Sequence, residues 1–121
     1  MKQVTLAGTA REVGTQYGKL SSEEILFSIY SYKDIFHQTT GKSWAESCKT
    51  ALQWLPVLQK DCPDIFAEME AMAAAAGLAF EDILALNQRS DIALTHYTDG
   101  CTSIAQVCKT DTKPLLLTWL I

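Results

Sequence analysis

Residues 8–20 read GTAREVGTQYGKL, and this stretch sets the architecture that the rest of the sequence extends. Thr9 can cap the helix that follows it, and Glu12 stands three residues later, which completes a capping box. Gly14 and Gly18 lie one turn apart on the same helix. Because glycine weakens a helix, two glycines at this spacing predict that another backbone packs closely against them.

The helical pattern continues outward from this stretch towards the C-terminus. Apolar residues recur at steps of three and four, which predicts one helix from Ala10 to about Thr40. Its apolar stripe consists of Val13, Tyr17, Leu20, Ile25, Ile29, Tyr32 and Phe36. On the N-terminal side, Val4-Thr5-Leu6 is a short apolar run closed by Gly8, and it predicts one strand.

Further helices are expected before residue 95. Ser43 and Glu46 form a second capping box, and Pro56 should kink or end the helix that they begin. Pro63 suits the first turn of another helix, which ends at Gly77. Its inward side chains are expected to be Ile65, Phe66, Met69, Met72 and Ala73. A short helix over residues 80–86 and a less regular stretch over residues 87–95 follow.

The character of the sequence changes after residue 97. Thr98-Asp99-Gly100 has turn chemistry, residues 101–107 alternate loosely, and residues 115–121 are almost wholly apolar. This pattern predicts a β-hairpin, which needs a partner sheet because an isolated two-stranded hairpin is only marginally stable. We therefore expect a mainly α fold, with a helical segment over residues 1–100 and the start of an incomplete sheet over residues 101–121.

Length and composition exclude several classes of protein. The chain has 121 residues, enough for one domain, and 48% of them are hydrophobic and 20% charged. Lys and Arg total 10 against 14 acidic residues and are spread singly, which argues against a nucleic-acid partner. Uncharged stretches such as residues 71–80 reach half the length of a membrane span, and no secretory signal begins the chain. We expect a soluble intracellular protein, cytoplasmic or peroxisomal, without a membrane partner.

The cysteines at positions 48, 62, 101 and 108 match no common zinc spacing, and the two histidines are far apart in sequence. We therefore expect neither a metal site nor another cofactor. Cys48 and Cys62 are expected to be small, partly buried core residues. Cys101 differs from them because it directly follows a glycine at the predicted start of a strand.

Cleavage of the Gly100–Cys101 bond would give Cys101 both a thiol and a free α-amine. The amine, whose ordinary pKa is about 8, can act as general base for its own thiol, so no histidine is needed. The same thiol can cut the bond by attacking the Gly100 carbonyl, because glycine leaves that carbonyl unhindered and tolerates a strained turn. Taken alone, the tripeptide Asp99-Gly100-Cys101 is a weak signal, because most such tripeptides are ordinary turns.

Two segments together carry a resemblance to a known family. Leu86-Asn87-Gln88-Arg89 followed by Asp99-Gly100-Cys101-Thr102-Ser103, with the glycines of residues 8–18, resembles the acyl-coenzyme A:6-aminopenicillanic acid acyltransferase (isopenicillin N acyltransferase) family. The resemblance covers residues 6 to about 117. It implies an N-terminal nucleophile hydrolase, whose precursor cuts itself into a helical α chain and a catalytic β chain of αββα architecture.

By this resemblance, residues 1–100 correspond to the α chain and Cys101 to the nucleophile. The autocleavage site comprises Asp99, Gly100 and Cys101, and Ser103 stands where the family has a hydroxyl residue involved in processing. The implied partners are a small acyl or amide substrate and the remaining β-chain domain. Acyl-coenzyme A is a possible co-substrate, and the resemblance does not decide between acyl transfer and hydrolysis.

The sequence departs from the family near its last residues. Family members continue far past position 121, and they carry an N-W-D-like motif where this chain has Thr118-Trp119-Leu120. The family's aspartate is a catalytic-site residue, so we expect the 121-residue chain to be inactive alone. The alternative is a non-catalytic helical interaction module or a degenerate truncated paralogue.

Some residues of the helical part have two interpretations. Arg89 and Asp91 could pair with each other or anchor the helical part to the catalytic part, and a structural role is favoured. The aromatic residues Tyr30, Phe36, Trp44 and Trp54 are expected to form core, or a surface for a domain beyond this chain.

Overall fold

The structure is a computed structural model, and it describes residues 3–94. All regular structure in this part is helical, which confirms the mainly α prediction there. The helices, in chain order, are α1 (Ala10–Leu20), α2 (Ser22–Thr40), α3 (Trp44–Ala51), the 3-10 helix η1 (Leu52–Trp54), α4 (Leu55–Asp61), α5 (Pro63–Ala76), α6 (Phe80–Asn87) and α7 (Arg89–Ala93). The β-hairpin predicted for residues 101–121 and the division at residue 100 lie outside the described residues.

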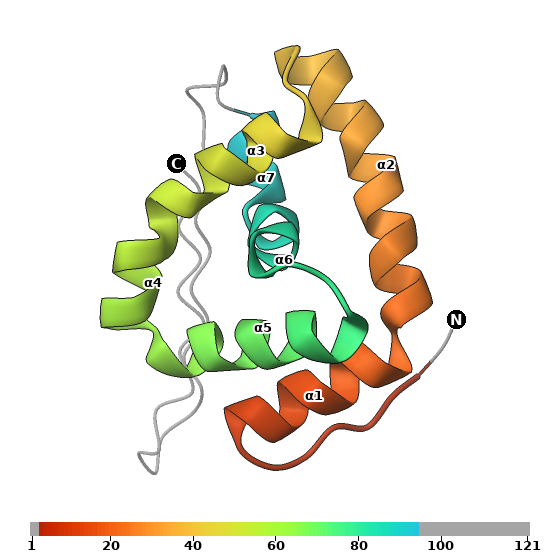
Figure 1. Cartoon of the computed structure of the whole chain (residues 1–121), viewed down its shortest axis with the longest axis vertical. Helices are drawn as coiled ribbons and strands as arrows, with labels where there is room; N and C mark the ends of the chain where they lie inside the picture. The colour runs from red at the N-terminus through yellow and green to blue at the C-terminus, as the bar shows by residue number, and fades with distance from the viewer. Residues whose placement is uncertain (1–2, 95–121) are drawn as a thin grey trace, which may run out of the picture.

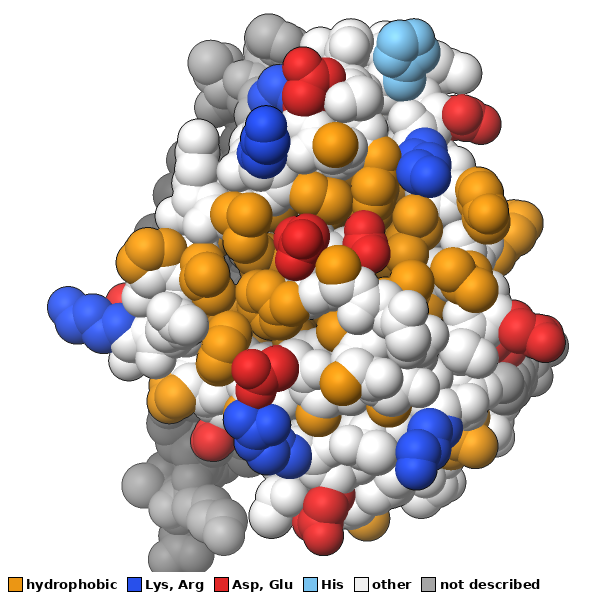
Figure 2. Space-filling view, in the orientation of Figure 1, with side chains coloured by type: hydrophobic (Ala, Val, Ile, Leu, Met, Phe, Trp, Pro, Cys, Tyr) orange, Lys and Arg blue, Asp and Glu red, His pale blue; other side chains and the backbone are white. Residues whose placement is uncertain are grey.

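The helices form a frame around α6 (Figure 1). α1 and α5 lie side by side along one edge, α2 forms the next edge, and α3, η1 and α4 follow the opposite side. The largest fully buried apolar side chains are Phe36 of α2, Leu84 of α6 and Ile92 of α7. Figure 2 shows apolar side chains gathered in the middle of one face and Lys and Arg at its rim. The core is therefore built around α6.

The predicted close approach at the two glycines is confirmed. A Cβ atom added at Gly14 would overlap the carbonyl oxygen of Glu68 and lie 2.9 Å from its carbonyl carbon. One added at Gly18 would overlap the carbonyl oxygen of Met72 and lie 2.9 Å from the Cβ of Ala75. Real Cβ atoms do not come this close to other heavy atoms, so the α1–α5 packing requires glycine at both positions.

The single helix predicted from Ala10 to Thr40 is wrong, because the chain turns at Ser21. Ser21 has φ −126° and ψ 23°, yet its N–H still donates to the Tyr17 carbonyl at 2.9 Å. The change of direction lets α1 follow α5 while α2 packs against α3, α6 and α7. Helical periodicity is nearly continuous through this point, so the sequence pattern does not reveal the turn.

The strand predicted for residues 4–6 is also wrong, because residues 3–9 form no strand. The side chain of Gln16, on α1, takes the place of a neighbouring strand for this segment. Its Nε2 donates to the Ala7 carbonyl at 2.8 Å, and its Oε1 accepts from the Ala7 N–H at 3.4 Å. These bonds hold the segment along α1 as irregular chain.

The predicted helix boundaries are otherwise confirmed. Both capping boxes form, with the N–H of Thr9 donating to Glu12 and that of Ser43 donating to Glu46, each at 2.8 Å. The helix that Ser43 begins ends before Pro56, which lies in the first turn of α4.

The five inward side chains predicted on α5 are correct with one exception. Met69 and Ala73 are buried, and Phe66 and Met72 pack against the core, but Ile65 is half-exposed. Four aromatic residues are expected to form core or a surface for a further domain. Phe36 and Trp44 stack in the core with ring centroids 5.7 Å apart, whereas Tyr30 and Trp54 are exposed.

Candidate functional site

The residues of the predicted cleavage site lie outside the described part of the chain. These residues are Asp99, Gly100, Cys101 and Ser103. The described part does show what precedes them. α6 and α7 lead towards the site, and the last described residue, Leu94, precedes Cys101 by seven positions.

The helices that lead to the site are firmly anchored. Ile83, Leu84 and Ala85 of α6 are 4% exposed or less, and so is Ile92 of α7. Gln88 joins the two helices, and its N–H donates to the Leu84 carbonyl at 2.9 Å. A segment with this much buried apolar surface is among the last to open in a folded protein, so these residues of α6 and α7 belong to the stable core of the described part.

The Leu86-Asn87-Gln88-Arg89 segment has a structural role within the described residues. Nη1 of Arg89 donates to the Leu86 carbonyl at 3.1 Å, near the end of α6, where the helix dipole favours a cation. In this part of the chain Arg89 forms no ion pair with Asp91. Anchoring of the helical part to the catalytic part stays a prediction, because the contact that Arg89 makes here is within the helical part.

The two cysteines within the described residues are buried or half-buried, as expected. Cys48 is 6% exposed, and its Sγ donates to Oδ1 of Asp82 over 3.9 Å. Burial, and then the negative charges of Asp82 and Glu81, raise the pKa of the Cys48 thiol to about 11. The thiolate is the reactive form, so Cys48 is inert near neutral pH. Cys62, at the junction of α4 and α5, is half-buried.

Asp82 organises the contact between α3 and α6. Its Oδ1 accepts a hydrogen bond from Nε1 of Trp44 at 2.7 Å, and its Oδ2 accepts one from the Ala79 N–H at 3.2 Å. The carboxylate thus satisfies an indole donor and a free N–H at the beginning of α6. The presence of Asp82 at this position is therefore explained by helix packing rather than by catalysis.

A cavity of about 650 Å³ opens between α1, α2, α5, α6 and the beginning of α7. Its wall is mainly apolar, and Tyr17, Glu24, Glu68 and Arg89 are among its polar lining residues. No sequence motif indicates this cavity, because its lining residues come from separate helices. Its volume lies within the range of small-molecule sites.

Neither a group of metal ligands nor a membrane-spanning helix occurs among residues 3–94. No group of three or more His, Cys, Asp or Glu side chains within this range could hold a metal ion. None of the helices there is both long and apolar enough to cross a membrane.

Comparison with known proteins shows a distant similarity. No family model matches the chain. The acyl-coenzyme A:6-aminopenicillanic-acid-acyltransferase 40 kDa form of Emericella nidulans is 30% identical to it over 112 residues. The match covers 91% of this chain and 31% of the relative, so the chain spans about a third of the relative's length. The chain is thus distantly similar to an acyltransferase.

Proposed function

We propose that this chain is the helical N-terminal part of an acyltransferase that cuts itself between Gly100 and Cys101. The observation that carries the proposal is the match of 112 residues to the Emericella acyltransferase. A match that covers 91% of 121 residues leaves about 11 outside it, so residue 101 falls within the matched span wherever the match begins. The sequence at this position, Asp99-Gly100-Cys101-Thr102-Ser103, is the segment on which the family resemblance depends.

The cleavage chemistry follows from the residues at the site. The Cys101 thiolate attacks the Gly100 carbonyl carbon, the C–N bond of the peptide breaks, and the departing nitrogen takes a proton to become the α-amine of Cys101. Water then hydrolyses the resulting thioester, which leaves a carboxylate on Gly100 and restores the thiol. Each step uses only the chain and water.

Acyl transfer then uses the same thiol, with its own amine as general base. The Cys101 sulfur takes an acyl group from an acyl-coenzyme A and releases the coenzyme A thiol. The amine of an acceptor such as 6-aminopenicillanic acid attacks the carbonyl of the acyl-Cys101 thioester. The acyl group is then bound to the acceptor as an amide, and the Cys101 thiol is released. If water attacks instead, the same thioester gives hydrolysis.

The helical part acts as a support in this proposal. The buried residues of α6 and α7 fix the point from which the chain continues towards Cys101. The raised pKa of Cys48 leaves it protonated near neutral pH, so it does not compete as a nucleophile.

The test uses the gene product that includes whatever coding sequence follows codon 121. We expect Cys101→Ala to abolish both the cleavage into two chains and acyl transfer, because one thiol performs both reactions. Cys48→Ala and Cys62→Ala are the matched controls and should leave cleavage intact. A Cys101→Ala protein that still yields two chains would assign cleavage to another group.

A second candidate is a helical module without catalytic activity, such as a degenerate truncated paralogue. It is favoured by Thr118 and Leu120, which stand where the resembling family carries asparagine and a catalytic-site aspartate. The genomic sequence after codon 121 distinguishes the two candidates. An open reading frame that continues into a sheet-forming sequence supports the acyltransferase, whereas a stop codon at that point supports the module.

A further inference from the structure

The cavity between α1, α2, α5, α6 and the beginning of α7 has an apolar floor. This floor is formed by Ile25 of α2, Met69 of α5 and Ile83 of α6, each at most 6% exposed. Met72 also lines the cavity and packs against the core. Methionine side chains adapt to neighbours of irregular shape. The cavity can therefore bury an apolar molecule of small size.

The charged side chains at the cavity favour a cation over an anion. Among its described lining residues, Glu24 and Glu68 are acidic and Arg89 is basic. Nη1 of Arg89 already donates to the Leu86 carbonyl at 3.1 Å. Glu24 already has an interaction partner, whereas Glu68 forms no ion pair with any residue of the range 3–94. The carboxylate of Glu68 is therefore the group best suited to receive a positive charge.

Two tyrosines support the same choice. Gly18 brings α1 against the backbone of Met72, and Tyr17, the residue before it, lines the cavity. Tyr32 lines the cavity from α2, and both tyrosines are partly buried against the core. A tyrosine ring attracts a cation to its face, and more strongly where water is excluded. Carboxylate, tyrosine and apolar floor together have the chemistry of a site for an organic cation.

We propose that this cavity binds an organic cation with an apolar body, such as a protonated alkylamine. The ammonium group pairs with Glu68, and the alkyl chain lies on the floor formed by Ile25, Met69 and Ile83. Glu68 is half-buried, so this pair is screened less than one on the open surface. An anion with the same body would meet two carboxylates instead. The site goes beyond the proposed function, because the chemistry at Cys101 uses none of these residues.

The experiment compares three probes that share an eight-carbon chain and differ in charge: octylamine, octan-1-ol and octanoate. An alkylamine, like lysine with its ordinary pKa of about 10.4, is a cation at pH 7. Calorimetric titration of the 121-residue chain measures the three dissociation constants. We expect octylamine to bind at least about tenfold more tightly than octan-1-ol, and octanoate to bind more weakly than octan-1-ol. In the nuclear magnetic resonance spectrum, the methyl signals of Met69 and Met72 should shift as octylamine is added.

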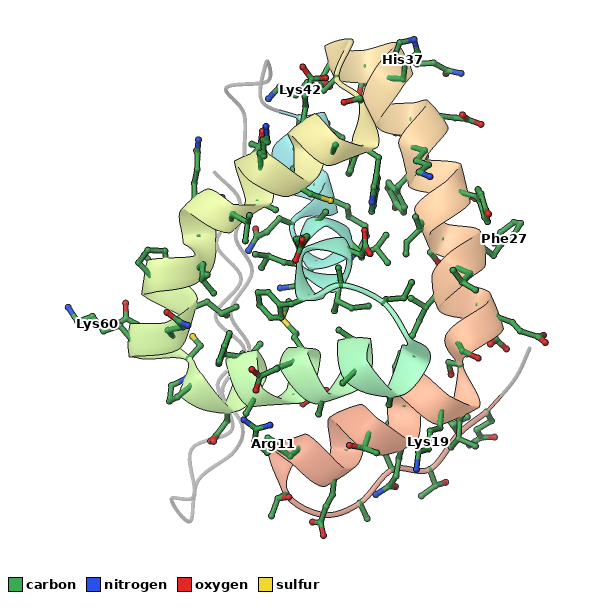
Figure 3. All side chains as sticks on the ribbon, in the orientation of Figure 1. Arg11, Lys19, Phe27, His37, Lys42 and Lys60 are labelled. Atoms are coloured by element: carbon green, nitrogen blue, oxygen red, sulfur yellow. The ribbon has the colours of Figure 1, made fainter. Side chains whose placement is uncertain are left out.

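The variant Glu68→Gln removes the charge and keeps the size of the side chain. We expect it to weaken octylamine binding at least about tenfold and to leave octan-1-ol binding within about twofold. Glu70→Gln is the matched control on the same helix and removes one negative charge as well. Glu70 accepts a hydrogen bond from Nη2 of Arg11 at 2.7 Å, and Figure 3 shows Arg11 near the end of α1 that lies away from α2. The control should bind octylamine within about twofold of the wild type.

Several outcomes would overturn the proposal. Binding of octanoate as tight as that of octylamine would assign the cavity to an anion at Arg89. An equal loss in Glu68→Gln and Glu70→Gln would show that octylamine responds only to the net charge of the chain. Unshifted methyl signals of the two methionines would place the amine elsewhere. The comparison of the three probes uses the wild type alone, so it decides the question even where a variant fails to fold.

Discussion

At the scale of single residues, Gly14 is where the sequence constrains the fold most tightly. On an open helix surface, Gly→Ala raises stability, because alanine has the higher helix propensity by about 1 kcal/mol. At Gly14 the added methyl would overlap the backbone of Glu68, so α1 and α5 would have to separate. The two effects change the free energy of unfolding in opposite directions, so the sign of the measured change shows which effect is larger.

We predict that Gly14→Ala lowers the free energy of unfolding by about 1–3 kcal/mol, the usual cost of overpacking. Urea denaturation followed by circular dichroism measures the change. Thr15→Ala, the next residue on α1, is the control and should stay within about 0.5 kcal/mol of the wild type. A stabilising Gly14→Ala would mean that the two backbones do not pack as closely as the structure shows.

Cys48 gives a second prediction at this scale. Its pKa of about 11 in the folded chain exceeds the ordinary value of 9.0, so the folded state holds the proton more tightly than the unfolded state. This contribution to stability is complete below pH 9 and is lost as the pH rises through 11. We expect the wild type to lose more stability than Cys48→Ala over that range, as measured by urea denaturation at each pH.

The reactivity of Cys48 checks the same property independently. At pH 8, iodoacetamide should label Cys48 at least about tenfold more slowly in the folded chain than in urea, since the thiolate is the reactive form. Peptide mass spectrometry separates Cys48 from the other cysteines. Equal rates in the two states would show that neither burial nor Asp82 protects the thiol.

At the scale of elements, helix starts could be predicted from sequence because their causes are local. Thr9 with Glu12 and Ser43 with Glu46 each satisfy free N–H groups within four residues. Helix direction could not be predicted in the same way. The turn at Ser21 depends on where α5 and α6 lie, and these helices follow in the chain by 40 residues or more.

The failed strand prediction for residues 4–6 has a similar cause. An apolar run becomes a strand only where another strand can pair with its backbone. Here the Gln16 side chain supplies the hydrogen bonds to Ala7, and periodicity carries no information about that partner. The partial exposure of Ile65 on α5, where it lines the cavity, likewise depends on which helices surround it.

We predict that Ser43→Ala lowers the free energy of unfolding by about 1 kcal/mol at pH 7, the usual cost of losing an N-cap. The backbone N–H and then the hydroxyl of Ser43 lower the pKa of Glu46, so the charged carboxylate stabilises the folded chain. That stabilisation is present above the ordinary carboxyl pKa and is lost as the pH falls through the lowered value. The difference between wild type and Ser43→Ala should therefore shrink at pH 3, and an undiminished difference would exclude Glu46 from the cap.

At the scale of the whole molecule, the sequence predicts the fold of the helical part more fully than it predicts the candidate site. The mainly α fold of residues 3–94 could be predicted from periodicity, caps and breakers, which are local signals. The candidate site depended on Asp99-Gly100-Cys101, which identifies a possible nucleophile but not the groups around it. Those groups are brought together only by tertiary packing, which no short motif encodes.

The last prediction is that the isolated 121-residue chain stays uncut at Gly100–Cys101. Cleavage requires a distorted peptide bond and donors that meet the developing oxyanion, and loss of one donor typically costs a factor of about 100 or more. The family resemblance implies that these donors belong mainly to a sheet beyond residue 121. A cysteine thiol of ordinary pKa, about 8.5, is also mostly protonated at pH 7. Intact-mass spectrometry after one day at neutral pH should show only the full-length mass, with Cys101→Ala as the control. A fragment that begins at Cys101 in the wild type alone would show that the helical part and the residues up to 121 suffice for processing.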